Sequence, residues 1–340
     1  MQRLQTERIH WIDTLRAIAI ILVVLGHTPG IQNYQQVVKY IYSFHIPLFF
    51  LISGILFNPK LTENTFSQFL QSQFWALMVP YSAWGLLTYV PWVILARHHG
   101  SYPDLSPFKP LVGLVYGTGS GTWLIHNGAL WFLPCLFSTR VLFFMTLKYC
   151  APMLPAMLVL FVTLGVVSAA VVPFPLPWGF DIALVAIGFF GLGFLLRKRL
   201  LSVRAPGAGY LWGFLILCLA VHLISFSSNA RVSMAERTYG NPLLFALAAF
   251  GGIVFWFAVA KCMRPSVFLS KLGQASFLIF VLHTLIFNLI TGVAVFVLKL
   301  PPAFKYDSLI IAAMYTLVAV LVLLPAQTIV RRFQPWMVGR

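Results

Sequence analysis

Ten stretches of about 20 mostly apolar residues follow one another along this chain of 340 residues. A helix needs roughly 20 such residues to cross the hydrocarbon core of a bilayer, which is about 30 Å thick. The stretches lie near residues 11–29, 38–57, 74–96, 128–147, 153–173, 179–196, 209–226, 242–261, 275–297 and 308–330. The sequence therefore predicts an all-α integral membrane protein with about ten transmembrane helices, forming a single domain over residues 1–340.

The composition excludes a soluble protein. Charged residues make up 9% of the chain and apolar residues 60%, whereas roughly 25% of residues are charged in a soluble domain. Seven acidic residues cannot provide a polar surface for a body of this size. The 23 Lys and Arg residues are scattered between the apolar stretches, so they form no continuous basic face of the kind that binds nucleic acid.

These basic residues indicate the orientation of the helices instead. With ten helices and the N-terminus inside, the cytoplasmic segments carry 14 of the 23 basic residues and the outer segments carry seven. The positive-inside rule then predicts both termini in the cytoplasm. Residues 97–127 become a long outer loop, which either re-enters the membrane or covers a site. Its segment Gly117–Gly121 lacks the Lys-Ser/Thr of a phosphate-binding loop and is interpreted as a flexible lid.

The four cysteines show no C-x-x-C spacing and lie in or beside apolar stretches. Neither a disulfide framework nor a metal site is expected from them. We expect no metal and no tightly bound cofactor.

The first helix carries the ionisable residues with the strongest case for function, Asp13, Arg16 and His27. Charged groups inside a membrane are costly and so require a reason. Eleven positions separate Arg16 from His27, which places both on one stripe of a helix, about 16 Å apart. Either Arg16 reaches lipid phosphate and His27 ends the helix, or the two belong to one functional site.

Four further residues have two interpretations each. His45, beside the helix-breaking Pro47, is either a polar packing partner or a site residue. Ser53 suits close helix packing or substrate contact, and Trp131 suits a membrane-interface position or the wall of a substrate pocket. His283 is either a satisfied core histidine or a functional one.

Four segments in a fixed order resemble those of a known family. They are Ile12–Arg16 with His27 eleven positions after Arg16, the segment Phe44–Gly54, the run Leu130–Pro134 and the helix Ser276–His283. Together they resemble the membrane acyltransferase 3 family, and within it the fucose 4-O-acetylase-like members. The similarity extends from about residue 9 to residue 330.

The resemblance implies an enzyme of the bacterial inner membrane that moves an acetyl or other short acyl group from cytoplasmic acetyl-CoA to a hydroxyl of an outer carbohydrate. Family acceptors include O-antigen, common-antigen and exopolysaccharide units, often carried on a polyprenyl lipid. The motif arginine and histidine of the family correspond to Arg16 and His27. One departure is the run of residues 68–80, which lacks the basic residues common in the family. Either Arg197, Lys198, Arg199 and Arg204 replace them as contacts for the donor phosphates, or the donor differs.

Acyl transfer to an alcohol requires a base for the hydroxyl proton and a stabiliser for the oxyanion. His27 is the expected base, with His45 as its orienting partner, as an acceptor contact or as the base itself. Arg16 is expected to bind donor phosphate or to pair with Asp13. Asp13, Ser53, Trp131 and His283 are the candidate substrate contacts. A covalent acyl-histidine stays open, as do a transporter or flippase that uses Arg16 and His27 as a charge site and a membrane scaffold with structural histidines.

Overall fold

A computed structural model describes residues 9–99, 102–202 and 208–339. Within these residues the helices are joined by turns, short 3-10 and π-helical segments and loops, and there is no β-strand. The α-helices are α1 His10–Gly26, α2 Gln35–Tyr42, α3 His45–Ile55, α4 Phe66–Gln73, α5 Val79–Pro91, α6 Arg97–His99, α7 Phe108–Tyr116, α8 Phe132–Tyr149, α9 Leu154–Val171, α10 Phe180–Ser202, α11 Ala208–Ser228, α12 Pro242–Cys262, α13 Val267–Gly292 and α14 Leu309–Phe333.

Eight helical stretches are long and apolar enough to cross a membrane, which confirms the predicted all-α membrane-spanning class. They are Gln35–Ile55, Phe66–Ala96, Gly128–Tyr149, Ala151–Val171, Pro177–Ser202, Pro242–Cys262, Val267–Val297 and Leu309–Phe333. The two other predicted helices are present but shorter: α1 has 17 residues, and the apolar part of α11 is Trp212–Ser228.

The first and ninth predicted helices, α1 and α13, pack closely and run in the same direction. A Cβ added to Gly273 of α13 would lie 2.0 Å from the carbonyl oxygen of Asp13, so the absence of a side chain there permits the contact. At the other end of the pair, the rings of His27 and His283 lie 5.1 Å apart. The pairing of α1 with α13 therefore brings two predicted site residues together from distant parts of the sequence.

A second close contact joins α3 to α10. A Cβ at Gly54 would lie 1.9 Å from the carbonyl oxygen of Phe190, and one at Gly193 would lie 2.2 Å from that of Leu51. Phenylalanine rings from α8 and α10 surround the buried Phe57 that follows α3. This packing fixes the direction of α3, which begins at His45 beside the site.

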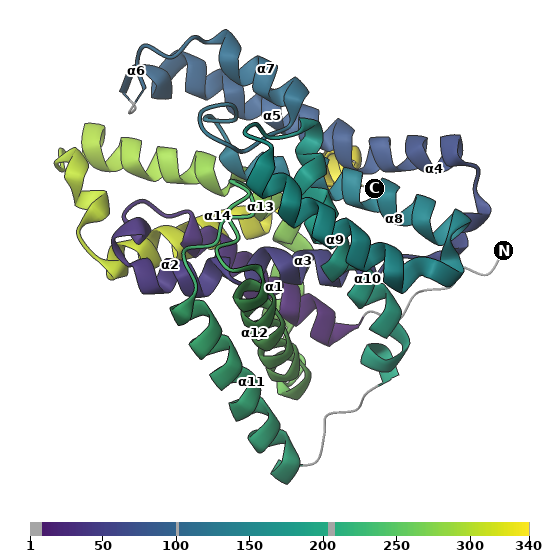
Figure 1. Ribbon diagram of the computed structural model, residues 1–340. Helices are drawn as coiled ribbons and strands as arrows, with labels where there is room; N and C mark the ends of the chain where they lie inside the picture. Colours follow the sequence, from purple (N-terminus) through teal and green to yellow (C-terminus); the bar gives the residue numbers. More distant parts are fainter. Residues whose placement is uncertain (1–8, 100–101, 203–207, 340) are drawn as a thin grey trace.

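The bundle has two ends, which we name after the residues of α1 (Figure 1). The Arg16 end is where α1 and α13 begin, and the His27 end is where α1 stops. Because α14 runs opposite to α13, with Tyr315 bonded to Thr291 and Gln327 bonded to Gln274, the described chain both starts and finishes at the Arg16 end. In Figure 1, α11 and α12 lie side by side and extend away from the other helices.

The segment 97–127, predicted as a loop, contains the helices α6 and α7. The α7 helix packs on α5, because the hydroxyl of Tyr81 donates to the carbonyl of Leu114 at 2.8 Å. Tyr116 donates to the carbonyl of Pro175 at 2.7 Å. Burial lowers the pKa of His126 in this segment to about 4, so its imidazole is neutral at pH 7. The segment is thus a folded cover on the His27 end.

Candidate active site

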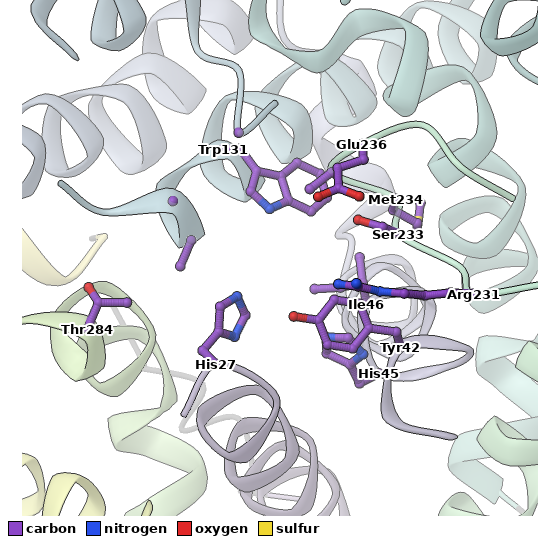
Figure 2. A pocket seen from close by; sticks show the side chains of 14 residues that line it. His27, Tyr42, His45, Ile46, Trp131, Arg231, Ser233, Met234, Glu236 and Thr284 are labelled. Atoms are coloured by element: carbon purple, nitrogen blue, oxygen red, sulfur yellow. The ribbon is translucent and has the colours of Figure 1, made fainter. Parts of the chain in front are cut away.

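A cavity of about 180 Å³ opens at the His27 end of the bundle (Figure 2). Its lining residues come from the end of α1, from α2 and α3, from the segment after α7, from the 3-10 turn before α8, from the loop before α12 and from α13. They are His27, Tyr42, His45, Ile46, Gly119, Gly128, Ala129, Trp131, Arg231, Ser233, Met234, Ala235, Glu236 and Thr284. His27, His45 and Trp131 were predicted as site residues, and the fold brings all three to this cavity.

His27 projects into this cavity from the end of α1, between Thr284 and Tyr42 (Figure 2). The chain turns soon after, at Gly30, whose φ of +76° favours glycine. The Nδ1 atom of His27 lies 2.7 Å from the carbonyl oxygen of Val23. Because a carbonyl only accepts, Nδ1 must carry the proton and Nε2 of the neutral ring keeps its lone pair. This bond therefore fixes the tautomer that a general base requires.

Two more histidines are held in the same way. The Nδ1 atom of His45 donates to the carbonyl of Ile41 at 2.6 Å, and that of His283 donates to the carbonyl of Phe280 at 2.8 Å. His283 is buried behind His27, and its Nε2 atom has no hydrogen-bond partner among the described residues. Three imidazoles thus gather at the His27 end with Nε2 as the available nitrogen of each.

Tyr42 links two of these rings. Its ring lies 5.1 Å from that of His45 and 6.3 Å from that of His27, and its hydroxyl donates to the carbonyl of Gly26 at 3.1 Å. The guanidinium of Arg231 lies over the face of the Tyr42 ring, 5.8 Å from the ring centre. Tyr42 therefore forms one wall of the cavity and contacts both the two histidines and Arg231.

Trp131 forms the opposite wall and lies beneath the Gly-rich segment. A Cβ at Gly119 would lie 2.7 Å from the Trp131 ring, so this glycine lies directly on the indole. Trp131 is 6% exposed, which is low for an aromatic anchor at a membrane interface. Gly119 is the residue of the segment 117–121 that lines the cavity, and a flexible lid stays a prediction.

The loop of residues 230–240 supplies the polar mouth of the cavity through Arg231, Ser233 and Glu236. Its ends are joined by Asn229, whose side chain accepts from the amide of Asn241 at 2.8 Å and donates to the carbonyl of Tyr239 at 3.1 Å. The two ends of the loop are therefore held together by hydrogen bonds of Asn229.

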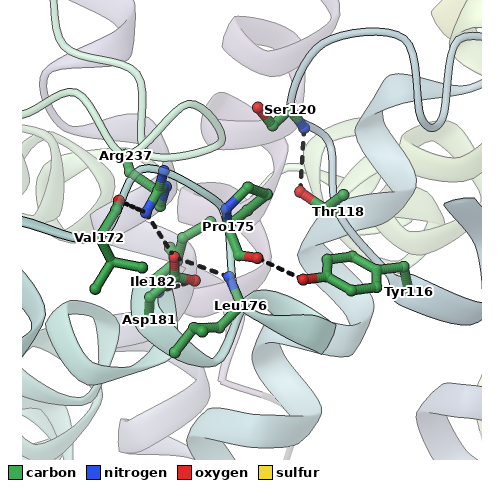
Figure 3. A network of polar contacts seen from close by, with 9 residues as sticks. All are labelled: Tyr116, Thr118, Ser120, Val172, Pro175, Leu176, Asp181, Ile182 and Arg237. Carbon is green, nitrogen blue, oxygen red and sulfur yellow. Dashed lines mark hydrogen bonds and ion pairs between the residues drawn. The ribbon is translucent and has the colours of Figure 1, made fainter. Parts of the chain in front are cut away.

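A buried ion pair ties this loop to α10 (Figure 3). The guanidinium of Arg237 lies 3.3 Å from a carboxylate oxygen of Asp181, whose side chain is 1% exposed. The same carboxylate accepts from the amides of Leu176 and Ile182, and Arg237 donates to the carbonyl of Val172 at 3.0 Å. No buried side-chain nitrogen or oxygen of Asp181 or Arg237 lacks a partner, so this network holds the loop in place beside the cavity.

The other predicted residues of α1 lie at the opposite end. Asp13 accepts from the hydroxyl of Ser270 at 3.0 Å and from the amide of Gln274 at 3.4 Å. Arg16 forms neither a hydrogen bond nor an ion pair with any residue that the structure describes. By helix geometry Arg16 lies about 16 Å from His27. Asp13 and Arg16 do not line the cavity. Asp13 is therefore not in a position to contact a molecule bound there.

The remaining predicted residues also lie outside the cavity. The hydroxyl of Ser53 donates to the carbonyl of Phe49 in its own helix at 2.8 Å. Arg197 donates to the carbonyl of Phe57 at 3.0 Å, while Lys198 and Arg199 are exposed near the end of α10. Arg204 lies outside the described residues. The basic cluster is thus at the Arg16 end, where the donor was expected.

Five lining residues were not predicted from the sequence: Tyr42, Arg231, Ser233, Glu236 and Thr284. Glu236 had a usable signal, because it is one of seven acidic residues in the chain and lies in a segment with two arginines. Tyr42, Ser233 and Thr284 carry no such signal, since their types are common in membrane helices and loops. In the described part of the chain no three His, Cys, Asp or Glu side chains group so as to hold a metal ion.

Comparison with known proteins agrees with the predicted resemblance. A family model described as an acyltransferase domain matches residues 9–327. Searches of curated proteins and of solved structures found no match. The narrower similarity to fucose 4-O-acetylase-like members stays a prediction. Because the match covers nearly the whole helical bundle, including both Arg16 and His27, the chain belongs to the acyltransferase 3 family.

Proposed function

We propose that this membrane acyltransferase transfers an acetyl group from acetyl-CoA to a hydroxyl of a carbohydrate of the cell envelope or of an exported polymer. The observation that carries the proposal is the bond from His27 Nδ1 to the carbonyl of Val23. It leaves the basic Nε2 nitrogen of a neutral imidazole available beside a cavity with an indole wall and a polar mouth. A base placed in this way suits the removal of a proton from an alcohol.

The reaction follows from this arrangement. The hydroxyl oxygen of the acceptor attacks the thioester carbonyl carbon while Nε2 of His27 takes the hydroxyl proton. The tetrahedral intermediate then loses the carbon–sulfur bond, and the departing thiolate receives the proton from the imidazolium. The products are the acetyl ester and CoA, and no acyl-enzyme forms. His45 and His283, close to the same reaction centre, orient His27 and limit water access.

The shape of the cavity supports a carbohydrate as the acceptor. Trp131 offers an apolar face to a sugar ring, and Arg231, Ser233 and Glu236 offer donors and acceptors for its hydroxyls. A cavity of about 180 Å³ accommodates a sugar unit rather than a polymer. The rest of the acceptor, including a polyprenyl carrier, would extend from the mouth toward the lipid.

The donor enters from the Arg16 end in this proposal. Arg16 and His27 lie about 16 Å apart. A donor whose phosphate binds at Arg16 can therefore place its thioester near His27. Arg197, Lys198 and Arg199 form the basic surface that attracts acetyl-CoA there. With this end in the cytoplasm of a bacterial inner membrane, both termini are cytoplasmic and the cavity faces outward.

Transfer of radiolabelled acetyl from acetyl-CoA to membrane glycans tests the proposal. The wild-type protein is compared with His27→Ala at equal, verified expression in membranes. Label that appears with the wild type and is lost with His27→Ala supports the proposal. Absence of label in both refutes acetyl-CoA as the donor, and equal label in both refutes His27 as the base.

A further inference from the structure

Thr284 on α13 has a side-chain hydroxyl that forms no hydrogen bond with a described residue. Its Oγ1 atom is buried and unpartnered, although Thr284 lines the cavity into which His27 projects. A buried hydroxyl without a partner costs free energy, so each such group in a native structure calls for a physical reason. Thr284 bears this cost in the cavity where the proposed reaction takes place.

The hydroxyl of Thr284 is free because the neighbouring histidine uses the carbonyl that it would otherwise contact. A threonine inside a helix can donate its hydroxyl to the carbonyl four residues earlier. For Thr284 this carbonyl belongs to Phe280, which already accepts from Nδ1 of His283 at 2.8 Å and from the helix amide. A carbonyl oxygen has two lone pairs, so it has no place for a third donor. Six other threonines of the described helices do form the bond: Thr88, Thr139, Thr146, Thr163, Thr291 and Thr316.

Thr284 lies beside the proposed base. It directly follows His283, whose ring lies 5.1 Å from that of His27, and Figure 2 shows His27 between Thr284 and Tyr42. Thr284 and His27 line the same cavity of about 180 Å³. A thioester carbonyl that is attacked next to His27 is therefore within reach of the Thr284 hydroxyl.

Two backbone amides at this cavity are unbonded as well. The helical stretch Gly128–Tyr149 begins at the cavity, and the amides of its first two residues donate to none of the described residues. Asn127, which precedes the stretch, does not cap it. Its side-chain amide donates instead to the carbonyl of Val281 at 2.8 Å, which holds the helix start against α13 about one turn before Thr284. Free amides at a helix start favour negative charge, so they add to the effect of the hydroxyl.

We infer that Thr284 is a catalytic residue whose hydroxyl donates a hydrogen bond to the oxyanion of the tetrahedral intermediate. The inference rests on the proposed function, which assigns the base and leaves the stabiliser of the oxyanion open. As the acceptor oxygen bonds to the thioester carbon, the carbonyl electron pair moves to the carbonyl oxygen and the hydroxyl proton moves to Nε2 of His27. Thr284 donates to this oxygen until the electron pair returns and the carbon–sulfur bond breaks.

The experiment measures transfer of radiolabelled acetyl from acetyl-CoA to glycans in membranes that contain equal amounts of folded protein. Thr284→Val keeps the shape of the side chain without its hydroxyl. It should lower the rate at saturating acetyl-CoA about 10²- to 10³-fold and leave KM for acetyl-CoA unchanged. Thr284→Ser keeps the hydroxyl and should retain most of the rate.

Thr316 provides a matched control. It is buried in α14 outside the cavity, and its hydroxyl donates to the carbonyl of Ala312 at 2.9 Å. Thr316→Val removes a hydroxyl from the same type of residue and should leave the rate per folded molecule unchanged.

The unfolding temperature separates a catalytic role from a structural one. The hydroxyl of Thr284 has no partner to lose in the protein without substrate, so Thr284→Val should not lower the unfolding temperature. A lower unfolding temperature with equal losses of rate in Thr284→Val and Thr284→Ser would overturn the inference, because the residue would then be structural.

Two further results would also overturn the inference. One is a wild-type rate for Thr284→Val. The other is a loss of rate that disappears when more glycan extract is added, because the hydroxyl would then bind the acceptor. Both results require an active wild type, whereas absence of transfer by the wild type would refute the proposed function and this inference with it.

Discussion

The two ends of α1 differ in how completely their polar groups are satisfied. At the His27 end, the histidine donates to Val23 and the loop beside it is held by a buried ion pair. At the Arg16 end, Asp13 is bonded to α13, but the guanidinium of Arg16 has no such partner among the described residues. The polar groups at the His27 end are therefore bonded within the protein, whereas Arg16 at the other end has no carboxylate within 4 Å among the described residues. Substitutions at the two ends should have different consequences.

The largest expected effect is on the His27 end. His27→Gln should lower the turnover number about 10²- to 10⁴-fold, because a positioned general base contributes this much. His222 is a matched control, since it is fully buried and donates through Nδ1 to the carbonyl of Ala248 but lies outside the cavity. His222→Gln should lower stability and leave turnover per folded molecule close to wild type. Turnover numbers normalised to folded protein test this, and equal losses in both variants would contradict a catalytic role for His27.

The next effect concerns the loop that closes the cavity. Asp181→Asn leaves Arg237 without its buried partner and should cost about 3 kcal/mol of stability. It should also raise KM for the acceptor more than KM for the donor, because the 230–240 loop lines the cavity in which we propose that the acceptor binds. Thermal unfolding and the two KM values check this prediction. The double variant Asp181→Asn with Arg237→Gln should recover part of the stability, and a double variant less stable than Asp181→Asn would argue against this pairing.

A smaller effect tests whether α1 and α13 must keep their contact. Gly273→Ala places a methyl group against the backbone of Asp13 and should cost 1–3 kcal/mol, as overpacking does. Gly292 in the same helix has nothing within 4 Å of an added Cβ. Gly292→Ala should be neutral or stabilising by up to about 1 kcal/mol. Unfolding temperatures of the two variants that do not differ would contradict this view of the helix pair.

The smallest effect is expected at Ser270. Ser270→Ala removes the hydrogen bond to Asp13 at the Arg16 end and should cost about 1 kcal/mol, with unchanged turnover at saturating donor. Unfolding measurements and kcat check this. A loss of turnover comparable with that of His27→Gln would mean that the chemistry is not confined to the His27 end.

The sequence was sufficient for the helical class and for the position of His27, which lines the cavity, while the roles of His27 and Arg16 stay predictions. The apolar stretches predict the helices because each one must satisfy its own backbone in lipid. The spacing of Arg16 and His27 predicts one helical stripe and opposite ends. The neighbours of these residues were not predictable, because they come from the contact of α1 with α13 across more than 250 positions. That contact depends on Gly273, which no local pattern distinguishes from the other glycines.

The measurement that tests the central claim most directly is donor binding and acetyl transfer by His27→Gln and Arg16→Gln, on the same purified preparations. We expect His27→Gln to bind acetyl-CoA with the wild-type Kd and to transfer almost no acetyl group. Arg16→Gln should bind acetyl-CoA at least roughly tenfold more weakly and still transfer at a near wild-type rate when donor is saturating. Transfer by His27→Gln at the wild-type rate, or an unchanged Kd for Arg16→Gln, would contradict the division of roles between the two ends of α1.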